Sequence, residues 1–117
     1  MQLTDLIDSQ INADERRGFP VKFGTDAERL DQLLRDLVGL TSEVGEFADS
    51  LKKVGLAISN PGYNGVSLSE ATPQLRSELA DISIYVFRLI SILDGNLESE
   101  ILRKMAINQE RYKHLER

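Results

Sequence analysis

Apolar side chains recur every three or four residues through the middle of this sequence, and this periodicity constrains the fold more than any other feature. The residues concerned are Leu30, Leu33, Leu34, Leu37, Val38, Leu40, Val44, Phe47, Leu51 and Val54. Such spacing places apolar side chains along one side of an α-helix, whereas a half-buried strand alternates every second residue. Thr25 or Asp26 provides an N-cap, and Gly55 is expected to end the helix. The sequence therefore predicts a long amphipathic helix.

Three further helices are predicted from turn and capping residues. Gly18 is expected to stop the first helix, Thr72 and Pro73 to start the third, and Gly95 to end it. The expected ranges are 4–17, 72–93 and 97–114. A chain of 117 residues cannot fill two separate cores. We therefore expect a single all-α domain spanning residues 1–117, with four to five helices in a bundle.

The segment from Leu56 to Thr72 is expected to be a loop. It contains the turn-forming residues Asn60-Pro61-Gly62 and Asn64-Gly65. A loop of this length is either functional or a tolerated surface insertion. Both interpretations stay open, and so does its role.

The expected third helix is apolar on almost every side between Leu79 and Leu93. Only Asp81, Ser83, Arg88 and Ser91 interrupt the apolar residues. A helix of this kind is surrounded by protein rather than laid on a surface. Because the chain is short, we expect a second copy to supply part of the cover, which makes the protein a homo-oligomer.

Charge and composition exclude several classes of site. Fourteen basic and nineteen acidic residues give a net charge of −5, and an acidic surface disfavours nucleic-acid binding. The absence of cysteine excludes disulfides, zinc–thiolate sites and thiol nucleophiles, and the one histidine, His114, excludes a His-rich metal site. No apolar run is long enough to span a membrane, and the first residues lack the basic region of a secretory signal. We therefore expect a cytoplasmic protein without membrane partners.

Two acidic pairs lie within the apolar helices. Glu43 and Glu46 share one face of the second helix, and Glu78 and Asp81 repeat the spacing in the third. Alone, the first pair is typical of a solvated helix face, but Asp81 among apolar neighbours needs a partner. If the two helices pack antiparallel, four carboxylates converge, and an all-oxygen site favours Mg²⁺ or Mn²⁺. Asp49, one turn further, is better explained as a partner of Lys53.

The fourth helix carries a polar stripe of Lys104, Asn108 and Arg111. Arginine offers two parallel donors and lysine a point charge, so the stripe suits phosphate oxygens. Cations near a helix C-terminus are equally explained by the helix dipole. Tyr85, one turn beyond Asp81, is either part of the same site or a core tyrosine.

Three motifs together resemble the MazG-like nucleoside triphosphate pyrophosphohydrolases, an all-α family. The motifs are Leu40-Thr-Ser-Glu43-Val-Gly-Glu46-Phe-Ala, Glu78-Leu-Ala-Asp81-Ile and Lys104-Met-Ala-Ile-Asn108-Gln-Glu-Arg111-Tyr. The resemblance covers roughly residues 30 to 112. It implies a helical dimer or tetramer that hydrolyses (deoxy)nucleoside triphosphates between the α- and β-phosphates, with Mg²⁺, in house-cleaning of the nucleotide pool.

The resemblance also implies a role for each site residue. Metal ligands would be Glu43, Glu46, Glu78 and Asp81, and phosphate contacts would come from Lys104, Asn108, Arg111 and Tyr85. Glu43 or Glu46 would also orient the attacking water. Many members have a further Glu where this chain has Ser42, which leaves the number of metal ions open.

Two alternative functions are compatible with the sequence. One is phosphoribosyl-ATP pyrophosphohydrolase, an enzyme of a related branch. The other is a non-catalytic helical oligomer that acts as a binding module. Base and sugar preference cannot be read from the motifs, although the first helix and the turn from Phe19 to Phe23 are candidates for a specificity pocket.

Overall fold

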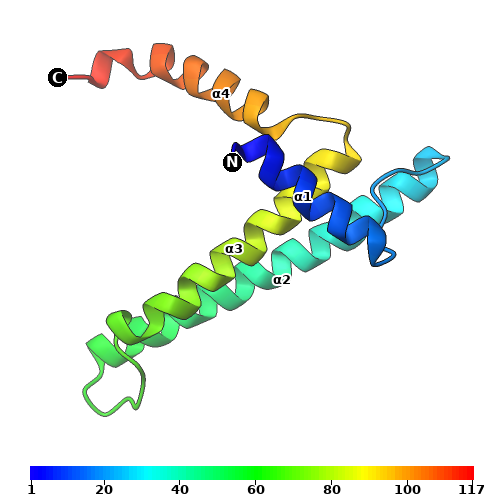
Figure 1. Cartoon of the computed structure of the whole chain (residues 1–117). Helices are drawn as coiled ribbons and strands as arrows, with labels where there is room; N and C mark the ends of the chain where they lie inside the picture. The colour runs from blue at the N-terminus through cyan, green and yellow to red at the C-terminus, as the bar shows by residue number, and fades with distance from the viewer. The chain divides into compact units, whose positions relative to one another are not determined.

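Every regular element of the protein is helical. A computed structural model describes all residues from 1 to 117. The elements are α1 (Leu3–Arg16), α2 (Asp26–Ser59), α3 (Leu68–Ile92), α4 (Leu97–Arg111) and a short 3₁₀ helix, η1 (Lys113–Leu115) (Figure 1). The prediction of an all-α fold is confirmed. None of these helices combines the length and the hydropathy that crossing a membrane requires.

The chain divides into two units. Unit 1 comprises residues 1–29 and 87–117, and unit 2 comprises residues 30–86. Helices α2 and α3 each contribute to both units. We describe each unit by itself.

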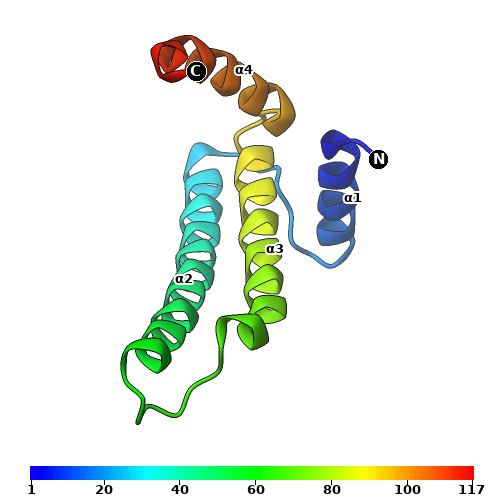
Figure 2. The same cartoon turned by 90° about the vertical axis from the view of Figure 1, so that its left-hand side faces the viewer.

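Unit 2 is a helical hairpin in which α2 and α3 run side by side in opposite directions (Figures 1 and 2). Its buried cluster consists of Val54 from α2 and Ala71 and Leu75 from α3, with Phe47 packed against it. Val54 and Phe47 belong to the periodic apolar set of the sequence. Other members of the set, such as Leu34 and Val38, are exposed, so the periodicity identified the helix but marked a wider surface than the side that faces α3.

Helix α3 begins one turn earlier than the sequence predicted. The Ser67 hydroxyl accepts a hydrogen bond from the Glu70 amide at 3.1 Å and donates one to the Glu70 carboxylate at 3.0 Å. Ser67 and Glu70 form a capping pair, which outweighs the start signal of Thr72 and Pro73. Pro73 therefore lies inside α3, where it has no N–H to donate to Ser69. The prediction that Thr72 caps this helix is wrong.

Helix α2 ends one turn later than predicted. It continues past Gly55 to Ser59, and the Asn60 side chain then donates to the Leu56 carbonyl oxygen at 3.1 Å. Gly55 does not adopt a positive φ, so it does not end the helix. The expected loop over 56–72 is consequently shortened to residues 60–67. At the other end of α2, Thr25 caps the helix as predicted, accepting from the Glu28 amide at 3.2 Å.

Unit 1 contains a buried ion pair between Arg88 of α3 and Asp14 of α1, with 3.2 Å between Nη1 and Oδ2. Arg88 also donates to the backbone carbonyl oxygens of Phe19 at 3.1 Å and Pro20 at 3.2 Å. Just before them, Gly18 adopts φ 87° and ends α1 as predicted. Through this ion pair and these hydrogen bonds, Arg88 binds both α1 and the segment that follows α1 to the end of α3.

The turn between α3 and α4, also in unit 1, uses a left-handed residue other than the expected glycine. Asp94 has φ 56°, and the Gly95 amide donates to the Ile90 carbonyl oxygen at 2.9 Å. This pattern is a Schellman motif. The Asn96 side chain then caps α4 by accepting a hydrogen bond from the Ser99 amide at 2.9 Å, so α4 starts where it was predicted to start. Helix α4 itself has no buried residue.

Candidate metal and phosphate site

The four predicted metal ligands come together in unit 2. Glu43 and Glu46 lie on α2, and Glu78 and Asp81 lie on α3. Partial burial raises the pKa of the Glu43 carboxyl above its ordinary value, and the negative charges of Glu46, Asp81 and Glu78 raise it further. Glu43 therefore lies within electrostatic range of the other three carboxylates. Their mutual repulsion calls for a positive charge.

Glu78 is the buried member of this cluster. Its exposed fraction is 6%, and its Oε2 atom is buried without a hydrogen-bond partner. An unsatisfied buried acceptor costs about 1–3 kcal/mol. The expectation that Asp81 would be the buried acid is wrong, because Asp81 is exposed whereas Glu78 is buried. A bound cation would satisfy the unpartnered oxygen.

The cluster is not assembled into a complete ion site. No three of its side chains are arranged so that they could hold a metal ion together. Glu46 and Asp81 are exposed, so these two side chains have room to change rotamer. The donor set consists entirely of carboxylate oxygens, which suits Mg²⁺. The unpartnered Oε2 of Glu78 and this donor chemistry both fit a divalent cation.

Tyr85 lies beside the cluster, and its position depends on a residue that the sequence interpretation missed. A Cβ atom added to Gly39 would lie 2.5 Å from Cε1 and Cζ of the Tyr85 ring and 2.6 Å from its hydroxyl oxygen. Gly39 is four residues before Glu43, and Tyr85 is four residues after Asp81. The sequence carried no specific signal for this contact, because Gly45 and Gly55 lie in the same helical pattern and meet nothing within 4 Å.

The predicted phosphate contacts Lys104, Asn108 and Arg111 lie on α4, in unit 1, and all three are exposed. Arg111 stacks over the ring of Tyr112, with 5.2 Å from its guanidinium carbon to the ring centre. The acids belong to unit 2, so a meeting of the two sets remains a prediction.

Asp49 has the structural role that the sequence favoured. Its Oδ2 lies 2.9 Å from Nζ of Lys53. The hydrogen bond from Lys53 and the charge of Lys53 lower the pKa of Asp49, and the same contacts raise the pKa of Lys53. Asp49 therefore already has a cationic partner, unlike the four clustered acids.

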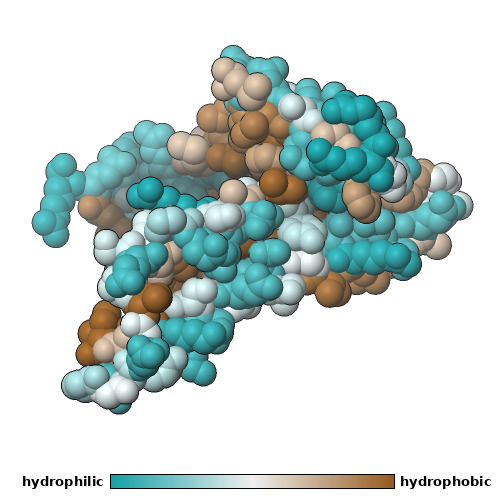
Figure 3. Space-filling view, turned by 60° about the horizontal axis from the view of Figure 1, so that its bottom comes forward, coloured by the Kyte–Doolittle hydropathy of each residue, from teal (hydrophilic) through white to brown (hydrophobic).

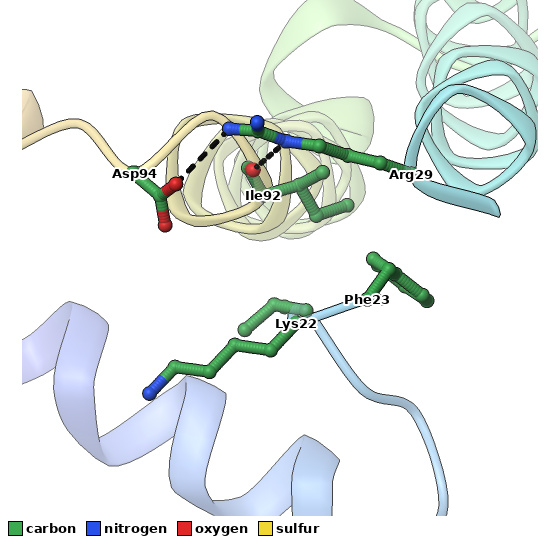
Figure 4. A pocket seen from close by; sticks show the side chains of 6 residues that line it. Lys22, Phe23, Arg29, Ile92 and Asp94 are labelled. Carbon is green, nitrogen blue, oxygen red and sulfur yellow. Dashed lines mark hydrogen bonds and ion pairs between the residues drawn. The ribbon is translucent and has the colours of Figure 1, made fainter. Parts of the chain in front are cut away.

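A hollow of about 270 Å³ lies in unit 1 at the predicted specificity turn (Figure 4). The residues lining it are Val21, Lys22, Phe23, Arg29, Ile92 and Asp94. Arg29 is held by a hydrogen bond from Nε to the Ile92 carbonyl oxygen at 2.8 Å and by an ion pair with Asp94 at 3.2 Å. The hollow offers cations, a carboxylate and an aromatic ring to a small ligand. The sequence indicated the turn but not Arg29 or Asp94.

Unit 2 also exposes apolar side chains on the side opposite Glu46 and Asp81. We call this set the apolar flank: Leu30, Leu37, Val44 and Leu51 of α2 with Leu79 of α3, each 41–56% exposed. Since a helix turns about 100° per residue, Glu46 and Val44 lie about 80° to either side of the core residue Val54. Asp81 and Leu79 lie about 80° to either side of Ala71 in the same way. Brown hydrophobic patches interrupt the polar surface in Figure 3.

Comparison of the chain with protein-family models, with curated proteins and with solved structures finds no match. The carboxylate cluster of unit 2 and its chemistry are therefore the basis for assigning a function.

Proposed function

We propose that the protein is a Mg²⁺-dependent nucleoside triphosphate pyrophosphohydrolase. It would cleave (deoxy)nucleoside triphosphates between the α- and β-phosphates, giving a monophosphate and pyrophosphate, and so remove unwanted nucleotides. The observation that carries the proposal is the buried, unpartnered Oε2 of Glu78 within a group of four carboxylates that have no cationic partner. The resemblance of the three sequence motifs to MazG-like enzymes supports the same assignment.

Each residue has a definite task in this reaction. Glu43, Glu46, Glu78 and Asp81 would hold Mg²⁺, which would neutralise the charge of the phosphate oxygens. Glu43 or Glu46 would also orient the attacking water. Lys104, Asn108, Arg111 and Tyr85 bind phosphate oxygens, and Mn²⁺ can replace Mg²⁺ in a site of oxygen ligands.

Self-association as a dimer or tetramer is part of the proposal. The apolar flank exposes leucine and valine side chains to water, and covering such a surface is favourable by about 25 cal/mol per Å². A second copy of the chain offers the same flank, so a two-fold arrangement covers both at once.

Pyrophosphate release from a panel of (deoxy)nucleoside triphosphates, with Mg²⁺ and with a chelator, tests the activity. Chelator-sensitive release with a monophosphate product is expected, and Glu78→Ala or Asp81→Ala should abolish it while circular dichroism shows an intact helical fold. Glu110→Ala, an exposed change on α4, serves as the control and should retain full activity. Normal turnover in both acid variants would sink the proposal.

The second candidate is a non-catalytic helical module, which the exposed apolar flank favours. A Mg²⁺ titration separates the two candidates. Strong stabilisation by Mg²⁺ without hydrolysis of any triphosphate, including phosphoribosyl-ATP, would support the module.

A further inference from the structure

We propose that Gly39 is a positioning residue of the carboxylate site and acts by holding the ring of Tyr85 against α2. The proposal rests on the proposed function for the role of the site. The contact between Gly39 and Tyr85 is independent of that function.

A side chain at position 39 would require the end of the Tyr85 side chain to move. Three atoms of Tyr85 lie 2.5–2.6 Å from the place that a Cβ on Gly39 would occupy. Carbon atoms in contact are normally about 3.5–4.0 Å apart, so a methyl group here displaces the ring. Since these atoms include Cζ and the hydroxyl oxygen, the displacement moves the polar end of Tyr85.

The location of this contact relates it to the acids. Residues four apart on a helix are neighbours, with Cβ atoms about 5–6 Å apart. Gly39 therefore adjoins Glu43 on α2, and Tyr85 adjoins Asp81 on α3. The tyrosine hydroxyl, lying on Gly39, is one helical turn from Glu43. Its O–H can donate to an oxygen of a ligand that the carboxylates hold through a cation.

The other glycines of α2 show that position 39 is special. A Cβ added to Gly45 or Gly55 meets nothing within 4 Å. All three glycines lie inside the same helix, where alanine is otherwise the better residue. Gly45→Ala is thus a matched control for Gly39→Ala.

A stability cycle tests the contact without reference to activity. Thermal unfolding is measured for Gly39→Ala, Gly45→Ala and Tyr85→Leu and for the double variant Gly39→Ala/Tyr85→Leu. We expect Gly39→Ala to lower Tm and Gly45→Ala to raise it by a few degrees. In the Tyr85→Leu background, Gly39→Ala should raise Tm as well, because the smaller side chain can move aside. If Gly39→Ala raises Tm in the unaltered background, the proposal is overturned.

Terbium luminescence tests the relation of Tyr85 to the carboxylates. Tb³⁺ binds oxygen ligands and emits when a nearby tyrosine is excited, and the chain has three tyrosines and no tryptophan. We expect emission that Mg²⁺ competes away, a loss of more than fivefold in Tyr85→Phe, and no such loss in Tyr63→Phe or Tyr112→Phe. In Gly39→Ala, emission at saturating Tb³⁺ should fall at least twofold while the Tb³⁺ affinity stays within threefold.

The two proposals fail differently in these experiments. Tb³⁺ binding with the same emission in Tyr85→Phe or Gly39→Ala overturns the positioning role and leaves the metal site standing. Failure to bind Tb³⁺ or Mg²⁺ overturns the proposed function, and with it the role of Gly39 in the site, whereas the stability cycle still reports whether the contact exists.

Discussion

The substitution Glu78→Gln removes one charge from the carboxylate cluster, and we expect it to stabilise the metal-free protein. Two like charges about 6 Å apart repel by about 0.7 kcal/mol in water and about 2.8 kcal/mol at an effective dielectric of 20. The amide is also neutral, and a neutral polar group without a partner costs less to bury than the charged, unpartnered Oε2. Allowing for solvent near the exposed acids, we expect a gain of about 2 kcal/mol.

The assay is thermal or urea unfolding in chelator and then in Mg²⁺. In chelator, a gain of about 2 kcal/mol raises Tm by roughly 6–10 °C for a chain of this size. In Mg²⁺ the difference in unfolding free energy between the variant and the unaltered protein should narrow or reverse. The unaltered protein gains about 2.7 kcal/mol of unfolding free energy when Mg²⁺ is at 100 times its Kd, whereas the variant has lost a ligand. Glu110→Gln, an exposed change of the same chemistry, should shift the unfolding free energy by less than about 0.5 kcal/mol.

Two results would refute the reasoning. If Glu78→Gln destabilises the metal-free protein, the carboxylate has a favourable partner that the repulsion argument omits. If the variant and the unaltered protein gain equally from Mg²⁺, Glu78 is not a ligand.

Three further substitutions or conditions have definite outcomes. The folded-state pKa of Glu43 is raised, so the folded protein binds a proton more tightly than the unfolded chain does. The stability of the metal-free protein should therefore fall as pH rises from about 4.5 through that raised pKa. In urea unfolding measured across this pH range, Glu43→Gln should make the dependence on pH weaker. Arg88→Met removes the closer cation of the buried Asp14 and leaves only Arg17 at 3.9 Å, so it should lower the unfolding free energy by about 3 kcal/mol in urea unfolding, part of which Asp14→Leu restores; an equal loss in the double variant contradicts this. Ser67→Ala removes the cap of α3 and should lower the unfolding free energy by about 1 kcal/mol, whereas the same loss from Thr72→Ala would favour the later helix start.

Long-range periodicity and local caps made most of the fold predictable. The apolar spacing of α2 identified the helix, but most of its members, such as Leu34 and Val38, are exposed, so the spacing alone did not identify the side that packs against α3. Gly18, Thr25 and Asn96 were recognised as helix ends because their capping chemistry is local. The predicted end of α2 at Gly55 and the predicted start of α3 at Pro73 were wrong. Each of these residues is compatible with a helix interior when a stronger capping signal lies one turn away.

The candidate site was predictable as a set of acids but not in its details. The spacing of Glu43, Glu46, Glu78 and Asp81 placed them on helix faces, yet it could not say which carboxylate is buried. That depends on the rotation of α3 against α2, which Ala71 sets together with the other core residues. The contact of Tyr85 with Gly39 depends on the distance between two backbones, a quantity that no single helix encodes.

Because Glu46 and Asp81 lie opposite the apolar flank, the number of bound cations is expected to depend in a simple way on the number of associated chains. If copies associate through Leu37 and Val44, the contact lies away from Glu46 and Asp81, and we expect the number of cation sites to equal the number of chains in the oligomer. Binding isotherms should then be non-cooperative and independent of protein concentration. Association and cation binding can be altered by separate sets of substitutions, and each property can be inherited or lost without the other.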